Sequence, residues 1–124
     1  MSYRCAIVDD EPLAVELLSE YLGKISRMEL VVTTDKLQAI TDLITDGKVD
    51  LILLDINLYG IQVEHINLLL RRKDCRIIIV TAYPLSHLKD LALEPVHGYL
   101  TKPVSFIRFR HELEKILGME LSLI

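Results

Sequence analysis

The sequence contains no tryptophan, only two cysteines and no continuous apolar run longer than four residues. Runs this short predict neither a transmembrane helix nor the apolar core of a signal peptide. The cysteines, Cys5 and Cys75, form no CxxC pair and are too few for a disulfide scaffold, which is typical of a protein in the reducing cytoplasm. Basic residues are also scarce: 14 Lys and Arg stand against 18 Asp and Glu, for a net charge of −4. We therefore do not expect direct nucleic-acid binding, which needs a basic surface.

Several catalytic and metal-binding signatures are missing as well. The sequence has no GxSxG, P-loop or GxGxxG motif, and thus none of the usual signs of a hydrolase or nucleotide-binding enzyme. Its histidines show no HExxH and no other metal-ligand spacing, so structural or surface roles are favoured over zinc binding. These histidines are His65, His87, His97 and His111.

The 124 residues are 51% hydrophobic, which suits one domain with a full core. Apolar residues at consecutive positions are typical of strands buried on both faces, whereas apolar residues every three or four positions predict helices. The two patterns alternate along the chain. The predicted strands are 5–8, 30–32, 51–54, 77–80 and 98–100; the helical segments lie within 13–25, 37–44, 66–70 and 106–117, with a shorter leucine-rich segment at 85–93.

Residues that begin or end helices agree with this alternation. Pro12 suits the first turn of a helix, and Asp46-Gly47 suits the end of one. We also expect Asp35 to cap the second helix and Pro103 to open the last one. Five βα units in alternation predict a parallel sheet with helices on both faces, joined by right-handed crossovers.

Polar side chains follow the predicted strands at the points where the strands end. In open α/β sheets, ligands bind beyond the carboxyl ends of the strands, so these residues are the candidates for a site. We expect two acids, a further acid, a hydroxyl and an ammonium to meet at one end of the sheet. In order of the strands they follow, these are Asp9 with Asp10, Asp55, Thr81, and Lys102.

Three carboxylates brought together repel one another unless a cation joins them. Mg²⁺ prefers oxygen ligands and is commonly held by carboxylates together with phosphate and water. The alternative is that Asp9 and Asp10 only cap the first helix. Lys102 facing the acids would be a point charge for a phosphoryl group, or else an ordinary solvated lysine. Thr81 would hydrogen-bond a phosphoryl oxygen, or else be a strand-end residue without a role.

The chain resembles the receiver domain of two-component response regulators. The residues that carry the resemblance are, in order, Asp9, Asp10, Asp55, Thr81, Lys102 and Pro103. Asp55 follows Asp10 by 45 residues, Thr81 follows Asp55 by 26, and Lys102 follows Thr81 by 21. The resemblance covers about residues 4–117. Segments VDDEPLA (8–14) and GYLTKPVSF (98–106) are most similar to the receivers whose output is a LytTR-type DNA-binding domain. This resemblance implies a flavodoxin-like (βα)₅ doubly wound sheet with strand order 2-1-3-4-5.

The resemblance also implies a set of roles. Asp55 would be the phosphoacceptor for a sensor histidine kinase. Mg²⁺ would be bound directly by Asp10, Asp55 and the backbone carbonyl of Asn57, and by Asp9 through water.

Lys102 and Thr81 would hold the phosphoryl oxygens. Tyr99 matches the aromatic switch position of the family, which turns inward when the threonine moves toward the phosphoryl group. The alternative for Tyr99 is a half-buried strand residue.

Two positions depart from the family pattern. Tyr59 stands where receivers usually carry Pro, and Val63 stands where they usually carry Gly, while Gly60 would absorb part of the turn. These departures favour one alternative, a pseudo-receiver that keeps the fold as an interaction module without phosphorylation. The other alternative is a haloacid-dehalogenase-type phosphatase, but the acid pair precedes Asp55 here and Asp55 heads Asp-Ile-Asn rather than DxD.

We expect residues 1–124 to form a single receiver domain, with any output domain outside this chain, either removed or never present. DNA would then be contacted only through that output domain, and no membrane contact is expected. Leu85, Leu88 and Leu91, with part of the last helix, would supply an apolar surface for a homodimer.

Overall fold

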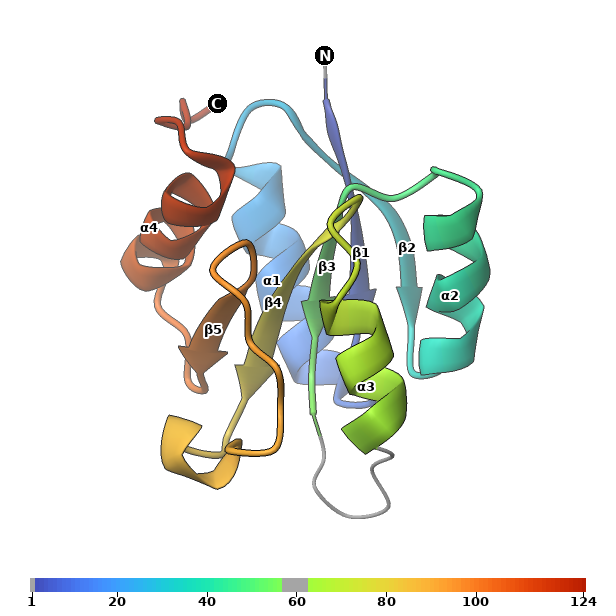
Figure 1. Ribbon diagram of the computed structural model, residues 1–124. Helices are drawn as coiled ribbons and strands as arrows, with labels where there is room; N and C mark the ends of the chain where they lie inside the picture. The colour runs from blue at the N-terminus through green and yellow to red at the C-terminus, as the bar shows by residue number, and fades with distance from the viewer. Residues whose placement is uncertain (1, 57–62) are drawn as a thin grey trace.

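The computed structural model describes residues 2–56 and 63–124. Within these residues the chain forms a parallel five-stranded sheet of order β2-β1-β3-β4-β5, as predicted (Figure 1). The strands are β1 (Tyr3–Val8), β2 (Met28–Thr34), β3 (Leu51–Leu54), β4 (Arg76–Thr81) and β5 (Gly98–Thr101). The α-helices are α1 (Pro12–Gly23), α2 (Leu37–Thr45), α3 (Val63–Leu70) and α4 (Phe106–Leu117).

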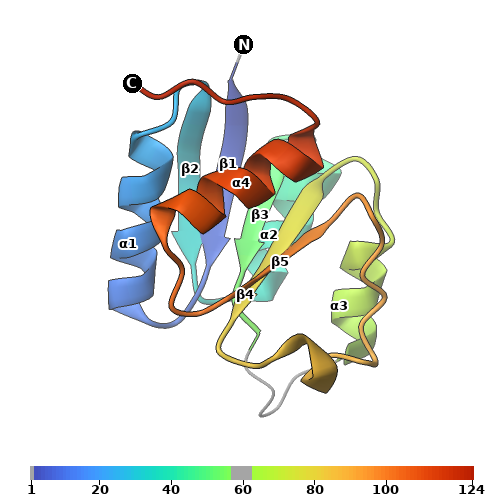
Figure 2. The same cartoon turned by 90° about the vertical axis from the view of Figure 1, so that its left-hand side faces the viewer.

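Helices cover both faces of the sheet, with α1 and α4 on one face and α2 and α3 on the other (Figures 1 and 2). The central strands are apolar at consecutive positions because their side chains alternate between two buried layers. In β1, Cys5 and Ile7 belong to the layer under α1 and α4. Ala6 and Val8 belong to the layer under α2 and α3. The doubly wound architecture predicted from the sequence is confirmed.

The ends of the helices follow the sequence signals only in part. Pro12 is the first residue of α1, and Gly47 follows α2 with φ of +68°, both as predicted. The predicted cap of α2 by Asp35 is wrong: Lys36 is the cap residue, and its N–H donates to Thr34 Oγ1 at 3.1 Å. Pro103 does not open the last helix either. Ser105 caps α4 by accepting a hydrogen bond from the N–H of the helix's third residue.

The connection between β4 and β5 departs from the predicted alternation. Residues 82–97 are all described, and they form one 3₁₀ turn, η1 (Leu85–His87), without an α-helix. Leu88 is buried beneath this connection against the α2–α3 layer, so the expected dimer surface of Leu85, Leu88 and Leu91 is not present as predicted. Leu85 is exposed and Leu91 is only partly exposed.

Candidate functional site

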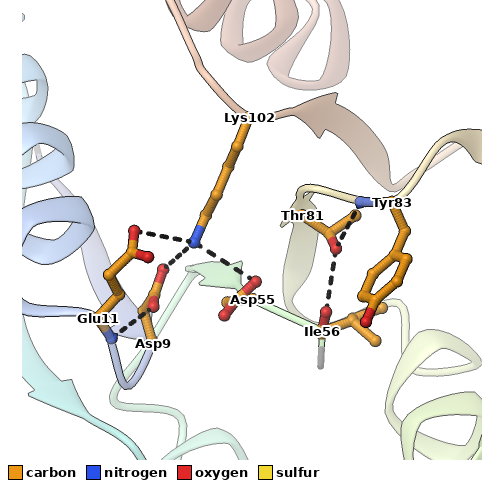
Figure 3. Close-up of polar contacts among 7 residues, drawn as sticks. All are labelled: Asp9, Glu11, Asp55, Ile56, Thr81, Tyr83 and Lys102. Carbon is orange, nitrogen blue, oxygen red and sulfur yellow. Dashed lines mark hydrogen bonds and ion pairs between the residues drawn. The ribbon is translucent and has the colours of Figure 1, made fainter. Parts of the chain in front are cut away.

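The carboxyl ends of β1, β3 and β5 bring together the acids and the lysine that the sequence singled out (Figure 3). Lys102 Nζ lies 2.9 Å from Asp9 Oδ2 and 3.5 Å from Asp55 Oδ1. Glu11 Oε1 is also near this ammonium, at 3.8 Å. Residues far apart in the sequence therefore form one charged cluster, because parallel strands end at the same edge of the sheet.

Asp9 occupies the most buried position of the cluster. Its side chain is only 1% exposed, and both of its carboxylate oxygens have partners. Oδ1 accepts a hydrogen bond from the Glu11 N–H at 2.9 Å, and Oδ2 accepts one from Lys102 at 2.9 Å. Asp9 thus fixes the backbone just before α1 and takes part in the charged cluster, but it does not cap the helix: Glu11 is the cap residue of α1, and no side chain makes a cap hydrogen bond there.

Asp9, Asp10 and Asp55 form a group of carboxylates whose oxygens lie within 4.8 Å of one another. Such a set of hard oxygen donors suits Mg²⁺, and Asp10 is exposed, so its oxygens are open to solvent. The predicted fourth ligand, the Asn57 carbonyl, lies outside the described residues, as does the departure at Tyr59. The structure therefore brings together the three side-chain ligands predicted from the sequence.

The electrostatics of Asp55 follow from this crowding. Burial, together with the negative charge of Asp9, raises the pKa of Asp55 from 3.8 to about 6. The positive charge of Lys102 acts in the opposite direction. For Lys102, burial lowers the pKa, but the hydrogen bond with Asp9 and the charge of Asp55 outweigh it, and the pKa is raised above 10.5. The ammonium is therefore charged at neutral pH and offsets part of the acid repulsion.

Thr81 lies at the end of β4, on the far side of Asp55 from Lys102 (Figure 3). It is fully buried, and its hydroxyl donates to the carbonyl of Ile56 at 3.0 Å while accepting from the Tyr83 N–H at 3.3 Å. The hydroxyl is thus beside the site but bonded to the backbone next to Asp55. To meet a phosphoryl oxygen, it would have to leave the Ile56 carbonyl.

Tyr99 of β5 packs partly buried against the α2–α3 layer. Its hydroxyl donates to the carbonyl of Tyr83 at 2.5 Å, in the loop that follows Thr81. Burial raises the pKa of this phenol above 10. In this structure the Tyr99 hydroxyl is bonded to the Tyr83 carbonyl while the Thr81 hydroxyl is bonded to the Ile56 carbonyl.

The sequence did not identify the residues that hold the loop of Lys102 in place. The N–H of Lys102 donates to the carbonyl of Thr81 at 2.8 Å, and the Lys102–Pro103 peptide bond is cis. Tyr21 of α1 donates its hydroxyl to the carbonyl of Val104 at 2.7 Å. Nothing in the local sequence pattern relates Tyr21 to a loop 83 residues away.

An apolar groove of about 380 Å³ adjoins the charged cluster, between the start of α1 and the loop that precedes α4. Lys102 and Glu11 line its end at the cluster, while Leu13 and Leu17 of α1 line its outer side. Leu13 is 76% exposed.

A search of the described helices finds no segment with the length and apolarity that a membrane span requires.

Comparisons with known proteins identify the family of this chain. The family model described as "Response regulator receiver domain" matches residues 5–114. The response regulatory domain of protein mrkE from Klebsiella pneumoniae is 28% identical, with a TM-score of 0.72, over 93% of this chain and 95% of that chain. The receiver domain of PhyR from Erythrobacter litoralis is 25% identical, with a TM-score of 0.71, over 96% and 92% of the two chains.

A similar fold is found in the signal receiver domain of a modulated diguanylate cyclase from Desulfovibrio desulfuricans, described as an example of alternate folding. It is 24% identical with a TM-score of 0.73, over 95% of this chain and 96% of that chain. No curated protein sequence matches the chain significantly. The family match over residues 5–114, on a sheet of order β2-β1-β3-β4-β5 with an acidic pocket at its carboxyl end, shows that the chain belongs to the response regulator receiver domain family.

Proposed function

We propose that this receiver is switched by phosphorylation of Asp55, with a phosphohistidine of a sensor histidine kinase as the donor. The observation that carries the proposal is the position of Lys102, whose ammonium lies 2.9 Å from Asp9 and 3.5 Å from Asp55. A cation at this place can neutralise an incoming phosphoryl group as well as the acids. The acidic group of Asp9, Asp10 and Asp55 is typical of the Mg²⁺ site of receivers.

The chemistry asks little of the protein beyond positioning and charge neutralisation. A carboxylate oxygen of Asp55 attacks the phosphorus, the phosphorus–nitrogen bond of the phosphohistidine breaks, and the imidazole leaves and takes up a proton. Asp55 needs no base because it reacts as the carboxylate. When bound, Mg²⁺ supplies further neutralisation of the phosphoryl oxygens.

The proposed ligands are Asp10 and Asp55 directly, the Asn57 carbonyl, and Asp9 through water. The indirect role of Asp9 is supported by its hydrogen bonds, because both of its oxygens already have partners in Lys102 and the Glu11 N–H. The open oxygens of Asp10 support direct binding.

Lys102 and Thr81 are the proposed partners of the phosphoryl oxygens, and Tyr99 is the proposed switch residue. Thr81 is well placed for this role, because its hydroxyl is bonded to the carbonyl of Ile56, the residue after Asp55. A move of this hydroxyl toward the phosphoryl group would free the Ile56 carbonyl and alter the loop whose Tyr83 carbonyl holds Tyr99.

We also propose that the output of this receiver is a LytTR-type DNA-binding domain joined to it. The support is the sequence similarity of segments 8–14 and 98–106. The match to the receiver family argues against the alternative of a haloacid-dehalogenase-type phosphatase. The pseudo-receiver remains as an outcome of the experiment.

The test is incubation of the protein with Mg²⁺ and acetyl phosphate, followed by mass spectrometry of the intact chain and its peptides. We expect one phosphoryl group per chain, located on Asp55, and none in Asp55→Asn. Asp42→Asn is the matched control, since Asp42 is an exposed acid of α2 that is not among the residues lining the pocket of Asp9 and Asp10, and this change should leave labelling unchanged.

Labelling of another residue, with Asp55 unmodified, would contradict the proposal. Failure of millimolar Mg²⁺ to bind, together with the absence of any phosphorylation, would establish the pseudo-receiver instead. Steady turnover of a phosphate ester, beyond one equivalent per chain, would point to a phosphatase.

A further inference from the structure

The turn that carries Lys102 is held by side chains on both sides of it. Residues 102–105 connect β5 to α4, and the Tyr21 hydroxyl of α1 donates a hydrogen bond to the Val104 carbonyl. The N–H of Lys102 itself is bonded to the Thr81 carbonyl. These bonds leave the two carbonyls that flank Lys102, those of Thr101 and Pro103, to find partners elsewhere.

Arg108, in the first turn of α4, supplies both partners. Its Nη1 donates to the Thr101 carbonyl at 3.3 Å and to the Pro103 carbonyl at 3.2 Å. Its Nη2 donates to the Thr101 hydroxyl at 3.1 Å. The backbone N–H of the same residue donates to the Ser105 hydroxyl that caps the helix, at 3.2 Å. One residue therefore ties the turn, before and after Lys102, to the start of α4.

We propose that Arg108 is a positioning residue for Lys102 in phosphoryl transfer; the proposal rests on the function given above. The lysine stem is long and flexible, so its ammonium reaches Asp9 and Asp55 together only if the backbone from which it extends is fixed. Displacement of a catalytic group by about 1 Å can cost up to about 100-fold in rate. The planar guanidinium suits this role because it presents several donors in a rigid fork, which an ammonium does not.

The first measurement needs no phosphodonor. We would record the ammonium NMR signal of Lys102 in the unphosphorylated protein, in the wild type and in Arg108→Ala, Arg108→Lys and Arg110→Ala. Arg110 is a matched control on the same helix, because its guanidinium bonds the Leu121 carbonyl far from the turn. We expect faster proton exchange of the Lys102 ammonium in Arg108→Ala, only partial recovery in Arg108→Lys, and the wild-type signal in Arg110→Ala.

The second measurement separates rate from binding. With acetyl phosphate at saturating Mg²⁺, we expect the initial rate of Asp55 phosphorylation to fall about 10-fold in Arg108→Ala. The Mg²⁺ dissociation constant, measured by calorimetry, should stay within about two-fold of the wild type. A purely structural role would instead weaken Mg²⁺ binding and thermal stability together with the rate.

A wild-type Lys102 signal and rate in Arg108→Ala would overturn the proposal, as would equal losses in Arg108→Ala and Arg110→Ala. Loss of the rate with a parallel loss of Mg²⁺ affinity would also overturn it. If the wild type itself takes no phosphoryl group, the proposed function fails, whereas the Lys102 signal still decides whether Arg108 holds the lysine.

Discussion

At the scale of single residues, the group of Asp9, Asp10 and Asp55 carries more negative charge than the nearby ammonium neutralises. Lys102 is the one cation that the described residues place against Asp9 and Asp55. The pKa of Asp55 rises from 3.8 to about 6 because burial and Asp9 disfavour its ionised form. A carboxyl whose pKa is raised by folding adds stability below its unfolded pKa and loses that stability as the pH rises through the folded value. At neutral pH the ionised Asp55 therefore destabilises the fold.

We accordingly expect Asp55→Asn to raise the free energy of unfolding at pH 7, without Mg²⁺, by about 1 kcal/mol after allowance for solvent screening. Addition of Mg²⁺ should stabilise the wild type more than the variant, because a ligand of the folded state adds to its stability. Urea unfolding with and without Mg²⁺ measures both effects. Asp42→Asn should show neither effect, and an Asp55→Asn variant less stable than the wild type at pH 7 would refute the expectation.

His97 is a buried histidine that the proposed mechanism does not use. Its Nδ1 accepts a hydrogen bond from the Ile77 N–H at 3.0 Å, and its Nε2 lies 2.6 Å from the Leu70 carbonyl. Both ring nitrogens are satisfied only if the ring is neutral with its proton on Nε2. Burial lowers the pKa of His97 below 6.5, with Glu94 acting against this shift and Arg76 adding to it.

Because the lowered pKa means that the unfolded chain binds the proton more tightly, the stability contributed by His97 is complete above pH 6.5 and is lost as the pH falls below it. We expect a slope of at most about 1.4 kcal/mol per pH unit from this one group. Urea unfolding of the wild type and of His97→Gln between about pH 7.5 and about pH 5, a range that spans the ordinary histidine pKa of about 6.5, measures this slope. An unchanged slope in the variant would assign the pH dependence to another group.

The candidate site was predictable from the sequence where strand ends alone determine position. Asp9, Asp10, Asp55 and Lys102 each follow a strand, and parallel strands bring their ends together. The partners of the lysine turn were not predictable in this way, because Arg108 reaches it by folding back from the next helix. The direction of the Thr81 hydroxyl was not predictable either, because it depends on the hydrogen bond to the Ile56 carbonyl.

At the scale of elements, the connection between β4 and β5 shows a conflict between local and tertiary preference. Its leucines and other helix formers favour a helix in residues 85–93, yet the segment contains only the turn η1. Asn67 of α3 binds its backbone twice: Nδ2 donates to the Asp90 carbonyl at 2.8 Å, and Oδ1 accepts from the Ala92 N–H at 2.7 Å. The second of these bonds uses a donor that a continuous helix would need for itself, and such a contact between distant residues cannot be read from local periodicity.

We expect Asn67→Ala to loosen this connection without unfolding the protein. The Ala92 amide loses its acceptor, so its hydrogen exchange should become about 10-fold faster, as expected for loss of one hydrogen bond of about 1.4 kcal/mol. Hydrogen–deuterium exchange by NMR gives this rate directly. Leu68→Ala, at an exposed neighbour on the same helix, is the control, and equal exchange of Ala92 in both variants would contradict the role given to Asn67.

At the scale of the whole molecule, the segment after α4 runs across the end of the molecule at which β1 begins and α1 ends (Figure 2). Gly118 ends the helix with φ of +67°, and the chain then crosses toward the turn between α1 and β2. Leu121 is only 2% exposed. Its backbone is bonded on both sides by α4, its N–H to Glu114 at 2.8 Å and its carbonyl to Arg110 at 2.7 Å.

We expect Leu121→Ala to lower the free energy of unfolding by about 3 kcal/mol, because a buried leucine is replaced by a cavity. Leu123→Ala is the matched control, since Leu123 is 48% exposed and should cost far less. Urea unfolding of the two variants measures the difference. Equal effects would mean that the segment is not packed in the way described.

The parallel sheet with helices on both faces was predictable from the alternation of βα units, whereas the strand order was expected only from the resemblance to receiver domains. The consecutive apolar residues of β1, β3 and β4 indicated burial on both sides, and the structure confirms it. The path of residues 118–124 was not predictable, since a short polar and apolar segment after a helix has no periodicity. Its position depends on pairing with distant backbone, such as the bond from the Ser26 N–H to the Ser122 carbonyl at 2.9 Å.

The start of β1 and the carboxyl end of the chain both lie at the end of the molecule opposite the cluster of acids (Figures 1 and 2). A fluorescent protein or affinity tag fused at either end would therefore stand clear of an approaching phosphodonor. A domain joined after residue 124 would begin about 20 Å from Asp55, which is the length of one strand. The effect of phosphorylation must therefore either be transmitted through the domain to its opposite end or be read by a partner that binds around the cluster of acids.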